Sequence, residues 1–217
     1  AYWIEHGPLA STLGPYSAWI GLLAGFLAGM LMGLLMSGLS ITLKADQVIS
    51  GITLVVFGVG LSNYLYRQAF TTLSERVQGM PVIEIPLLSK IPVIGDIFFK
   101  HDPTVYMALL LVVGVWYLLF RTTWGLKIRS VGENPAAADT SGINVEQTRY
   151  VATILGSGLV GLAGAVLTVV QLTLFREGIV AGKGWIAVAL VIFSRWRQPK
   201  LALIGSFVFG LADSIQY

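Results

Sequence analysis

The chain has 217 residues, of which 55% are hydrophobic and 12% are charged, and its formal net charge is +3. Charged residues make up about 25% of an ordinary soluble domain. This composition, with its mean hydropathy of +0.78, therefore predicts an integral membrane protein. The few cations lie in loops beside apolar runs, which indicates membrane topology and argues against nucleic-acid binding. The sequence contains no cysteine, which excludes disulfides and thiolate metal sites.

Four apolar runs are long enough to cross roughly 30 Å of hydrocarbon as helices. They cover residues 18–43, 48–66, 103–120 and 150–174. Two further apolar pieces, 185–193 and 201–212, are too short to cross alone, and the cationic residues 195–200 between them should reach water. The predicted fold class is therefore all-α, a polytopic membrane helix bundle with a broken pair of short helices near the C-terminus. We expect the whole chain, 1–217, to form one transmembrane domain, with further segments beyond both of its ends.

Glycines recur every four residues in the first span, which aligns them on one helix face. Small residues let helix backbones approach closely, and in lipid this packing drives helix association. We expect this face to pack against another helix, and the glycines of the fourth span to do the same. Phe26 and Met30, off that face, should tolerate leucine. The glycines assigned to packing are Gly21, Gly25, Gly29 and Gly33 in the first span, and Gly158, Gly161 and Gly164 in the fourth.

The second span carries two amide side chains, Gln47 and Asn63. A hydroxyl can bond to a carbonyl of its own helix, but an amide in a membrane wants a partner or a water-lined cavity. Gln171 near the outer end of the fourth span and Trp185 in the broken segment add an amide and an aromatic face, which suits a sugar or a nucleoside. These four residues are candidate solute contacts. The alternatives are structural hydrogen bonding for the amides and a membrane-interface position for Trp185.

Two long segments, 67–102 and 121–149, connect the spans. Lys and Arg are denser beside the span ends on the side that carries 121–149, so the positive-inside rule places 121–149 in the cytoplasm and 67–102 outside. The outer loop alternates apolar residues with Pro and Gly, which is typical of a segment that buries itself. It either seals the helix bundle or binds a soluble partner protein.

Residues 121–149, called the polar segment below, carry the signals of a short helix. Asn134 can cap a helix that starts at Pro135, whose missing N–H would be unpaired at that position anyway. The three alanines that follow favour helix, and Gly142 supplies the left-handed residue that ends one. Asn144, with a glutamine three residues later, predicts a second helix start that leads into the fourth span. A compact helix with caps at both ends predicts a rigid contact surface for a partner in solution.

The sequence GLKIRSVGENPAAADTSGINV, residues 125–145, resembles the cytoplasmic loop of permease subunits of bacterial ABC importers in the ribose and nucleoside branch. The resemblance continues through LKADQVISG at 43–51 and GKGWIAVALVIFSRWRQP at 182–199, and so covers most of the chain. It implies a permease subunit of the bacterial cytoplasmic membrane that forms a homo- or heterodimer with a second permease subunit. An external solute-binding protein would deliver a simple sugar or a nucleoside.

The same resemblance implies that the polar segment is the coupling element that docks on a separate ATPase subunit. ATP and Mg²⁺ would belong to that subunit, and no cofactor to this chain. The residues implied in coupling are Arg129, Glu133, Asn134, Pro135, Ala136, Ala137, Ala138, Asp139 and Gly142.

Two other classes of function compete with this interpretation. A secondary transporter driven by an ion gradient often carries Asp, Glu or Arg inside its spans, and the four predicted spans contain none. A membrane-anchored scaffold without transport would need neither a polar second span nor a broken tail. Enzymatic activity has little support, because the only histidines, His6 and His101, show no ligand spacing, and the Gly-rich runs lack the Lys-Ser/Thr of a phosphate-binding loop. We therefore expect a non-catalytic permease subunit.

Overall fold

The computed structural model describes residues 16–69, 80–81, 83–84, 100–176, 178–180, 182–194 and 199–215. Helices dominate this part of the chain, which confirms the predicted all-α membrane bundle. In chain order the elements are α3 (Ser17–Ser37), the π-helix η2 (Gly38–Thr42), α4 (Gln47–Ala69), β1 (Ile83–Glu84), β2 (Lys100–His101), α6 (Pro103–Arg121), α7 (Thr123–Glu133), α8 (Pro135–Thr140), α9 (Val145–Ala165), the π-helix η3 (Val166–Gln171), α10 (Lys183–Phe193) and α11 (Pro199–Ile215). The two short strands pair antiparallel, with Ile83 opposite His101.

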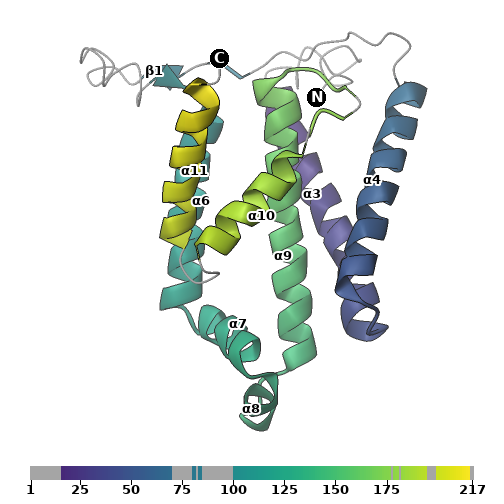
Figure 1. Cartoon of the computed structure of the whole chain (residues 1–217), viewed down its shortest axis with the longest axis vertical. Helices are drawn as coiled ribbons and strands as arrows, with labels where there is room; N and C mark the ends of the chain where they lie inside the picture. Colours follow the sequence, from purple (N-terminus) through teal and green to yellow (C-terminus); the bar gives the residue numbers. More distant parts are fainter. Residues whose placement is uncertain are drawn as a thin grey trace.

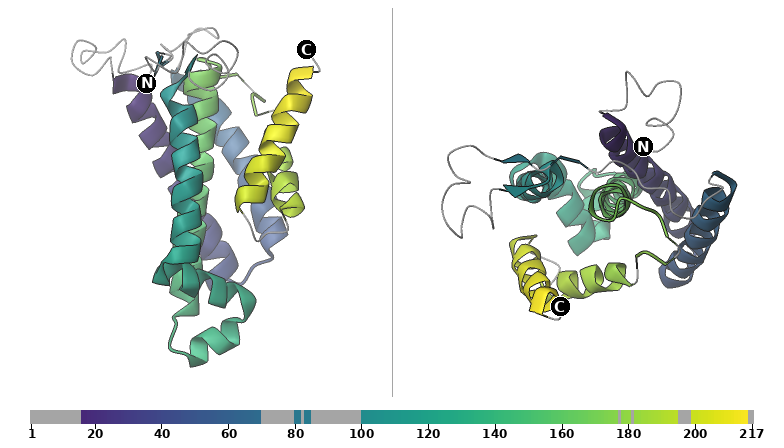
Figure 2. Two further views of the ribbon diagram at one scale, coloured as in Figure 1. Left: turned by 90° about the vertical axis from the view of Figure 1, so that its left-hand side faces the viewer. Right: turned by 90° about the horizontal axis from the view of Figure 1, so that it is seen from above.

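Four helical runs are long and apolar enough to cross a membrane, and they confirm the predicted spans. They are Ser17–Thr42, Gln47–Gln68, Pro103–Arg121 and Val145–Gln171. Figure 1 shows these runs aligned with the long axis of the molecule, and α7 and α8 together at one end of it. That end is called the polar end below. Seen end-on, α9 occupies the centre of the bundle (Figure 2, right).

The central contact of the bundle joins α3 to α9 through their backbones. A Cβ atom added at Gly29 would lie 2.4 Å from the carbonyl oxygen of Ser157, and one added at Gly161 would lie 2.3 Å from the carbonyl oxygen of Gly25. Real Cβ atoms essentially never come within 3.0 Å of another heavy atom, so any side chain would force the two helices apart. Gly33 is buried on the same face, and Gly21, one turn before Gly25, is half-buried.

The contact row on α9 differs in one position from the row expected from glycine spacing. It follows Gly158, Gly161 and Ala165, at steps of three and four residues along one helix face. Gly164 lies off this row, and a Cβ there would meet nothing within 4 Å. The expected packing role of Gly164 is therefore not seen in the described part of the chain.

Phe26 and Met30 also take part in this interface, contrary to the expectation that they lie off it. Their side chains come within 2.8 Å of the Cβ position of Gly158. Two large α3 side chains thus fill the space that Gly158 leaves open. The contact is formed by glycines on both helices and by side chains that pack over them.

The helices around this pair are mostly exposed on their apolar sides. On α4, Val55, Val56 and Val59 are all more than half exposed. Such faces suit contact with lipid or with another membrane-embedded protein. The predicted broken helix pair is confirmed: α10 slants toward the polar end, and α11 packs on α10 and returns beside α6 (Figure 1). The cationic residues 195–198 and most of the loop 67–102 lie outside the described residues.

The backbone contact predicts a strong dependence on residue size at Gly161. Gly161→Leu should destabilise the protein by about 1–3 kcal/mol, because the added side chain has no space against Gly25 and Gly29. The check is the thermal unfolding midpoint of the detergent-solubilised protein. Gly156→Leu is the matched control, since a Cβ at Gly156, in the same helix, meets nothing within 4 Å. Equal loss in both variants would contradict the assigned interface.

Candidate functional site

The polar segment begins with a helix, α7, that the sequence analysis did not anticipate. Thr122 caps it, because its Oγ1 accepts a hydrogen bond from the N–H of Gly125 at 3.2 Å. Gly125 is buried at the corner with α6, where a Cβ would lie 2.2 Å from the carbonyl oxygen of Leu118. Only glycine allows so close a corner. The available signal was a threonine cap followed by apolar residues at helical spacing, Trp124, Ile128 and Val131.

The predicted short helix, α8, is confirmed together with both of its caps. Asn134 Oδ1 accepts a hydrogen bond from the N–H of Ala137 at 3.1 Å, and Pro135 occupies the first helical turn. At the other end Gly142 has φ +80°. The N–H of Gly142 donates to the carbonyl of Asp139 at 2.9 Å, and the N–H of Ile143 donates to the carbonyl of Ala138 at 3.0 Å. This pair of bonds is a Schellman motif, which satisfies carbonyls that would otherwise lack donors.

The next helix starts directly after this motif. Asn144 Oδ1 accepts a hydrogen bond from the N–H of Gln147 at 2.9 Å, as the sequence predicted. The hydroxyl of Thr148, which is buried, adds a bond to the carbonyl of Asn144 at 2.7 Å. Four residues, 141–144, therefore join α8 to α9 through a corner that is hydrogen-bonded on both sides. The corner is stiff, because bending it would break several of these bonds.

The outer surface of the polar segment contains a cavity of about 720 Å³. Both helix starts contribute to its lining, which consists of Pro135, Ala136, Asp139, Gly142, Ile143, Asn144, Val145, Glu146 and Arg149. Ala136, Ala137 and Asp139 are exposed, and a partner protein could reach them. Ala138 is only 3% exposed. The small side chain of Ala138 is therefore buried within the polar segment, and its implied role in coupling does not rest on an exposed side chain.

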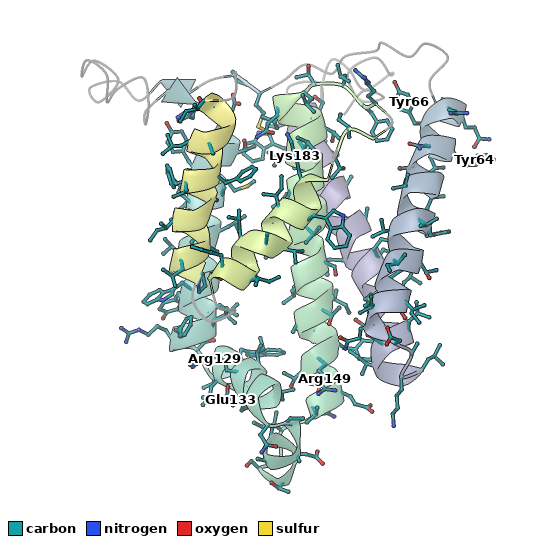
Figure 3. The ribbon with its side chains drawn as sticks, in the orientation of Figure 1. Tyr64, Tyr66, Arg129, Glu133, Arg149 and Lys183 are labelled. Atoms are coloured by element: carbon teal, nitrogen blue, oxygen red, sulfur yellow. The ribbon has the colours of Figure 1, made fainter. Side chains whose placement is uncertain are left out.

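The remaining residues implied in coupling lie on α7. The guanidinium carbon of Arg129 is 5.0 Å from the centre of the Phe120 ring, a cation–π contact that ties α7 to the end of α6. Glu133 is exposed at the last residue of α7. Figure 3 shows Arg129, Glu133 and Arg149 together at the polar end. This end therefore presents both signs of charge to a partner.

The four candidate solute contacts are not brought together. Gln47 is the first residue of α4, at the polar end, and Asn63 follows sixteen residues later, which is roughly 24 Å at 1.5 Å per residue. Gln171 ends η3 at the opposite end, and Trp185, in the first turn of α10, is 75% exposed. Asn63 and Gln171 precede, by three and four residues in the sequence, the rings of Tyr66 and Phe175, whose centroids are 4.8 Å apart. Gln47 cannot share a solute with them.

A second cavity, of about 630 Å³ and mostly apolar, lies between η2, α4 and α9 at the polar end. It is lined by Leu34, Leu35, Gly38, Leu39, Thr42, Leu43, Thr53, Leu54, Phe57 and Tyr150. The hydroxyls of Thr42 and Tyr150 share a hydrogen bond at its edge. Sequence reasoning missed this contact, because no local pattern connects residues that are 108 positions apart. Among the residues that the structure describes, no three His, Cys, Asp or Glu side chains are grouped as metal ligands.

Residues 6–217 match the model of a family described as branched-chain amino acid transport system / permease component. The chain belongs to this family of membrane permeases. No solved structure matches it.

Curated relatives of the chain include three ABC transporter permease proteins. The putative glucose ABC transporter permease protein TsgC13 of Haloferax volcanii is 40% identical over 202 residues, which cover 91% of this chain and 60% of that protein. The nucleoside ABC transporter permease protein NupC of Lactococcus lactis is 37% identical, with 95% and 65% covered. The guanosine ABC transporter permease protein NupQ of Bacillus subtilis is 35% identical, with 94% and 64% covered. The resemblance carried by residues 125–145 is confirmed, and the chain spans less than two thirds of the length of these relatives.

The caps of α8 predict its local stability. Asn134→Ala removes the acceptor of the Ala137 N–H and should cost about 1 kcal/mol of helix stability. Amide hydrogen exchange of residues 136–140 should become about fivefold faster, the factor that corresponds to this free energy. Mass spectrometry of exchanged, solubilised protein measures it. Ser130→Ala, which removes a hydroxyl bonded within α7, is the control and should leave these amides unchanged. Unchanged exchange in Asn134→Ala would mean that the cap does not hold the helix.

Proposed function

We propose that the chain forms the membrane-spanning part of an ATP-driven importer and that the polar segment docks on a separate ATP-hydrolysing subunit. The observation that carries this proposal is α8, a helix capped at both ends, exposed on one side and joined stiffly to a membrane span. A soluble subunit that binds such a helix can move the span. The named activities of the relatives, all ABC transporter permeases, support the same function.

The partners follow from the same arrangement. ATP and Mg²⁺ belong to the ATPase subunit, and this chain is a non-catalytic subunit of the importer. A second permease subunit would cover part of the exposed apolar surface of the outer helices, and lipid would cover the rest. An extracytoplasmic solute-binding protein would approach the end opposite the polar end. The location is the cytoplasmic membrane of a bacterium, with the polar segment in the cytoplasm.

The transported solute is a simple sugar or a nucleoside. Relatives named for glucose, nucleosides and guanosine support this class, which is rich in hydroxyl groups. Asn63 and Gln171, near the outer end of the bundle, offer amides that can both donate and accept hydrogen bonds. They are the candidate first contacts for a solute that enters from outside.

An ion-gradient-driven transporter is the alternative, and the spans argue against it. Residues 17–66, 103–120 and 150–171 carry no charged side chain apart from Lys44 and Asp46, which lie in the turn between α3 and α4. Ion coupling commonly uses an intramembrane carboxylate or another ionisable group. In this chain the charges lie at span ends and in the connecting segments instead, which agrees with a transporter driven by ATP on another subunit.

The orientation can be tested with single cysteines, because these 217 residues contain none. Ala136→Cys and Gln68→Cys place thiols at exposed positions at opposite ends of the bundle. A membrane-impermeant thiol reagent added to intact cells should label Gln68→Cys, and should label Ala136→Cys only after the cells are permeabilised. The reverse pattern would place the polar segment outside and would exclude docking on a cytoplasmic ATPase.

Docking can be tested at Gly142, whose φ of +80° strongly disfavours a β-branched residue. Gly142→Val should leave membrane insertion intact, and should reduce both the amount of ATPase subunit recovered with the permease and the uptake by reconstituted vesicles. Gly132→Val is the matched control, since Gly132 is exposed in α7 and a Cβ there meets nothing within 4 Å. If both variants bind the ATPase and transport equally well, the polar segment is only a linker.

A further inference from the structure

The hydrogen bond between Thr42 and Tyr150 differs from the other hydroxyl contacts near it. The hydroxyls of Ser37, Ser40 and Thr53 each donate to a carbonyl four residues back in their own helix, at 2.7–2.9 Å. This is how a hydroxyl usually satisfies itself in an apolar helix. Thr42 and Tyr150 instead bond to each other, and so connect the end of η2 to the second turn of α9. The bond is a specific link between two spans.

On one side of this link, Tyr150 belongs to the same stiff unit as α8. The Schellman motif at Gly142 fixes α8 to the corner, and the Asn144 cap fixes the corner to α9. Tyr150 follows within the next two turns of that helix. If α8 tilts as a rigid piece, the hydroxyl of Tyr150 must therefore move with it.

On the other side, Thr42 is joined to α4 by a short and well-defined turn. The N–H of Ala45 donates to the carbonyl of Leu39 at 3.0 Å, across Lys44, which has the left-handed φ of 52°. Asp46 then caps α4, with Oδ1 accepting from the N–H groups of Val48 and Ile49 at 2.8 and 3.0 Å. Movement of Thr42 is thus passed to the first turn of α4.

Like α6, α4 packs more loosely in the bundle than α3 and α9 do, and a smaller share of it is buried. It meets α3 and η2 near the polar end and diverges from α3 toward the other end (Figure 1). In contrast to the backbone contact of α3 with α9, the α4 glycines Gly51 and Gly60 have no close neighbour. A Cβ added at either would meet nothing within 4 Å. Toward its far end α4 also carries Asn63, a candidate solute contact. A pivot at the turn would change the position of that residue.

We propose that the Thr42–Tyr150 hydrogen bond is the contact through which movement of α8 reaches α4, so that both residues position α4 during transport. This inference rests on the proposed importer function. Neither residue needs to touch solute or ATPase. Loss of the bond should leave the ATPase subunit docked, and should lower the amount of solute transported for each ATP hydrolysed.

The test uses the complete reconstituted complex of permease, ATPase and binding protein, with uptake and ATP hydrolysis measured on the same vesicles. Tyr150→Phe and Thr42→Val each remove one hydroxyl. Each should lower the ratio of solute transported to ATP hydrolysed by about threefold to tenfold, as expected for the loss of one hydrogen bond between uncharged groups. The double variant should be no worse than either single variant, because both remove the same bond. Thr42→Ser keeps a hydroxyl and should retain most of the wild-type ratio.

Thr53→Val is the matched control. Thr53 lines the same apolar cavity, but its hydroxyl bonds to the carbonyl of Ile49 in its own helix. A wild-type ratio in both Tyr150→Phe and Thr42→Val would overturn the proposal, and so would an equal fall in Thr53→Val. If one of these two variants fails to assemble, the ratio of solute transported to ATP hydrolysed in the other variant decides whether the proposal holds. Failure of the proposed function itself is distinguishable, since the wild-type complex would then neither bind the ATPase nor take up solute.

Discussion

The close approach of α3 and α9 is the constraint on which the rest of the structure depends. Inside a bilayer the hydrophobic effect does not drive two helices together, so they must gain contact energy from packing. Gly25, Gly29 and Gly161 permit backbone contact, and larger side chains such as Phe26 fill the remaining space. Over the stretch in backbone contact this pair forms a fixed frame for the outer helices, and Tyr150 lies beyond that stretch, toward the polar end. Because the frame is rigid, movement has to occur where the chain leaves it.

The frame ends in π-helices at opposite sides of the bundle. At the end of η2 the N–H of Leu43 donates to the carbonyl of Gly38 at 3.0 Å. At the end of η3 the N–H of Leu172 donates to the carbonyl of Leu167 at 3.1 Å. Each is followed by a non-glycine residue in the left-handed region, Lys44 at φ 52° and Thr173 at φ 54°. Such widened turns inside helices are frequent at functional sites. Here they lie where the regular packing of α3 on α9 gives way to connections with other elements.

Local sequence signals were sufficient for the spans and for α8, because apolar length and cap chemistry act within a few residues. They were insufficient wherever the outcome depended on a distant partner. Glycine spacing identified Gly161 but also suggested Gly164, because the sequence does not show which side of α9 faces α3. The burial of Ala138 and the bond from Tyr150 to Thr42 likewise depend on how separate helices meet. The solute contacts stay a prediction, and the sequence did not show that Gln47 and Asn63 lie roughly 24 Å apart along one helix.

A stiff polar segment and a loosely packed α4 complement each other energetically. A partner can shift a conformational equilibrium only by the difference in its binding free energy between the two states. If α8 frayed on binding, part of that difference would be lost in unfolding a short helix that is marginal on its own. The caps at Asn134 and Gly142 prevent this loss, each by a modest stabilisation of the helix end. The same free energy would accomplish little against the backbone contacts of α3 and α9, whereas α4 has far fewer contacts to break. The element that moves should therefore be the one that the glycine frame leaves outside.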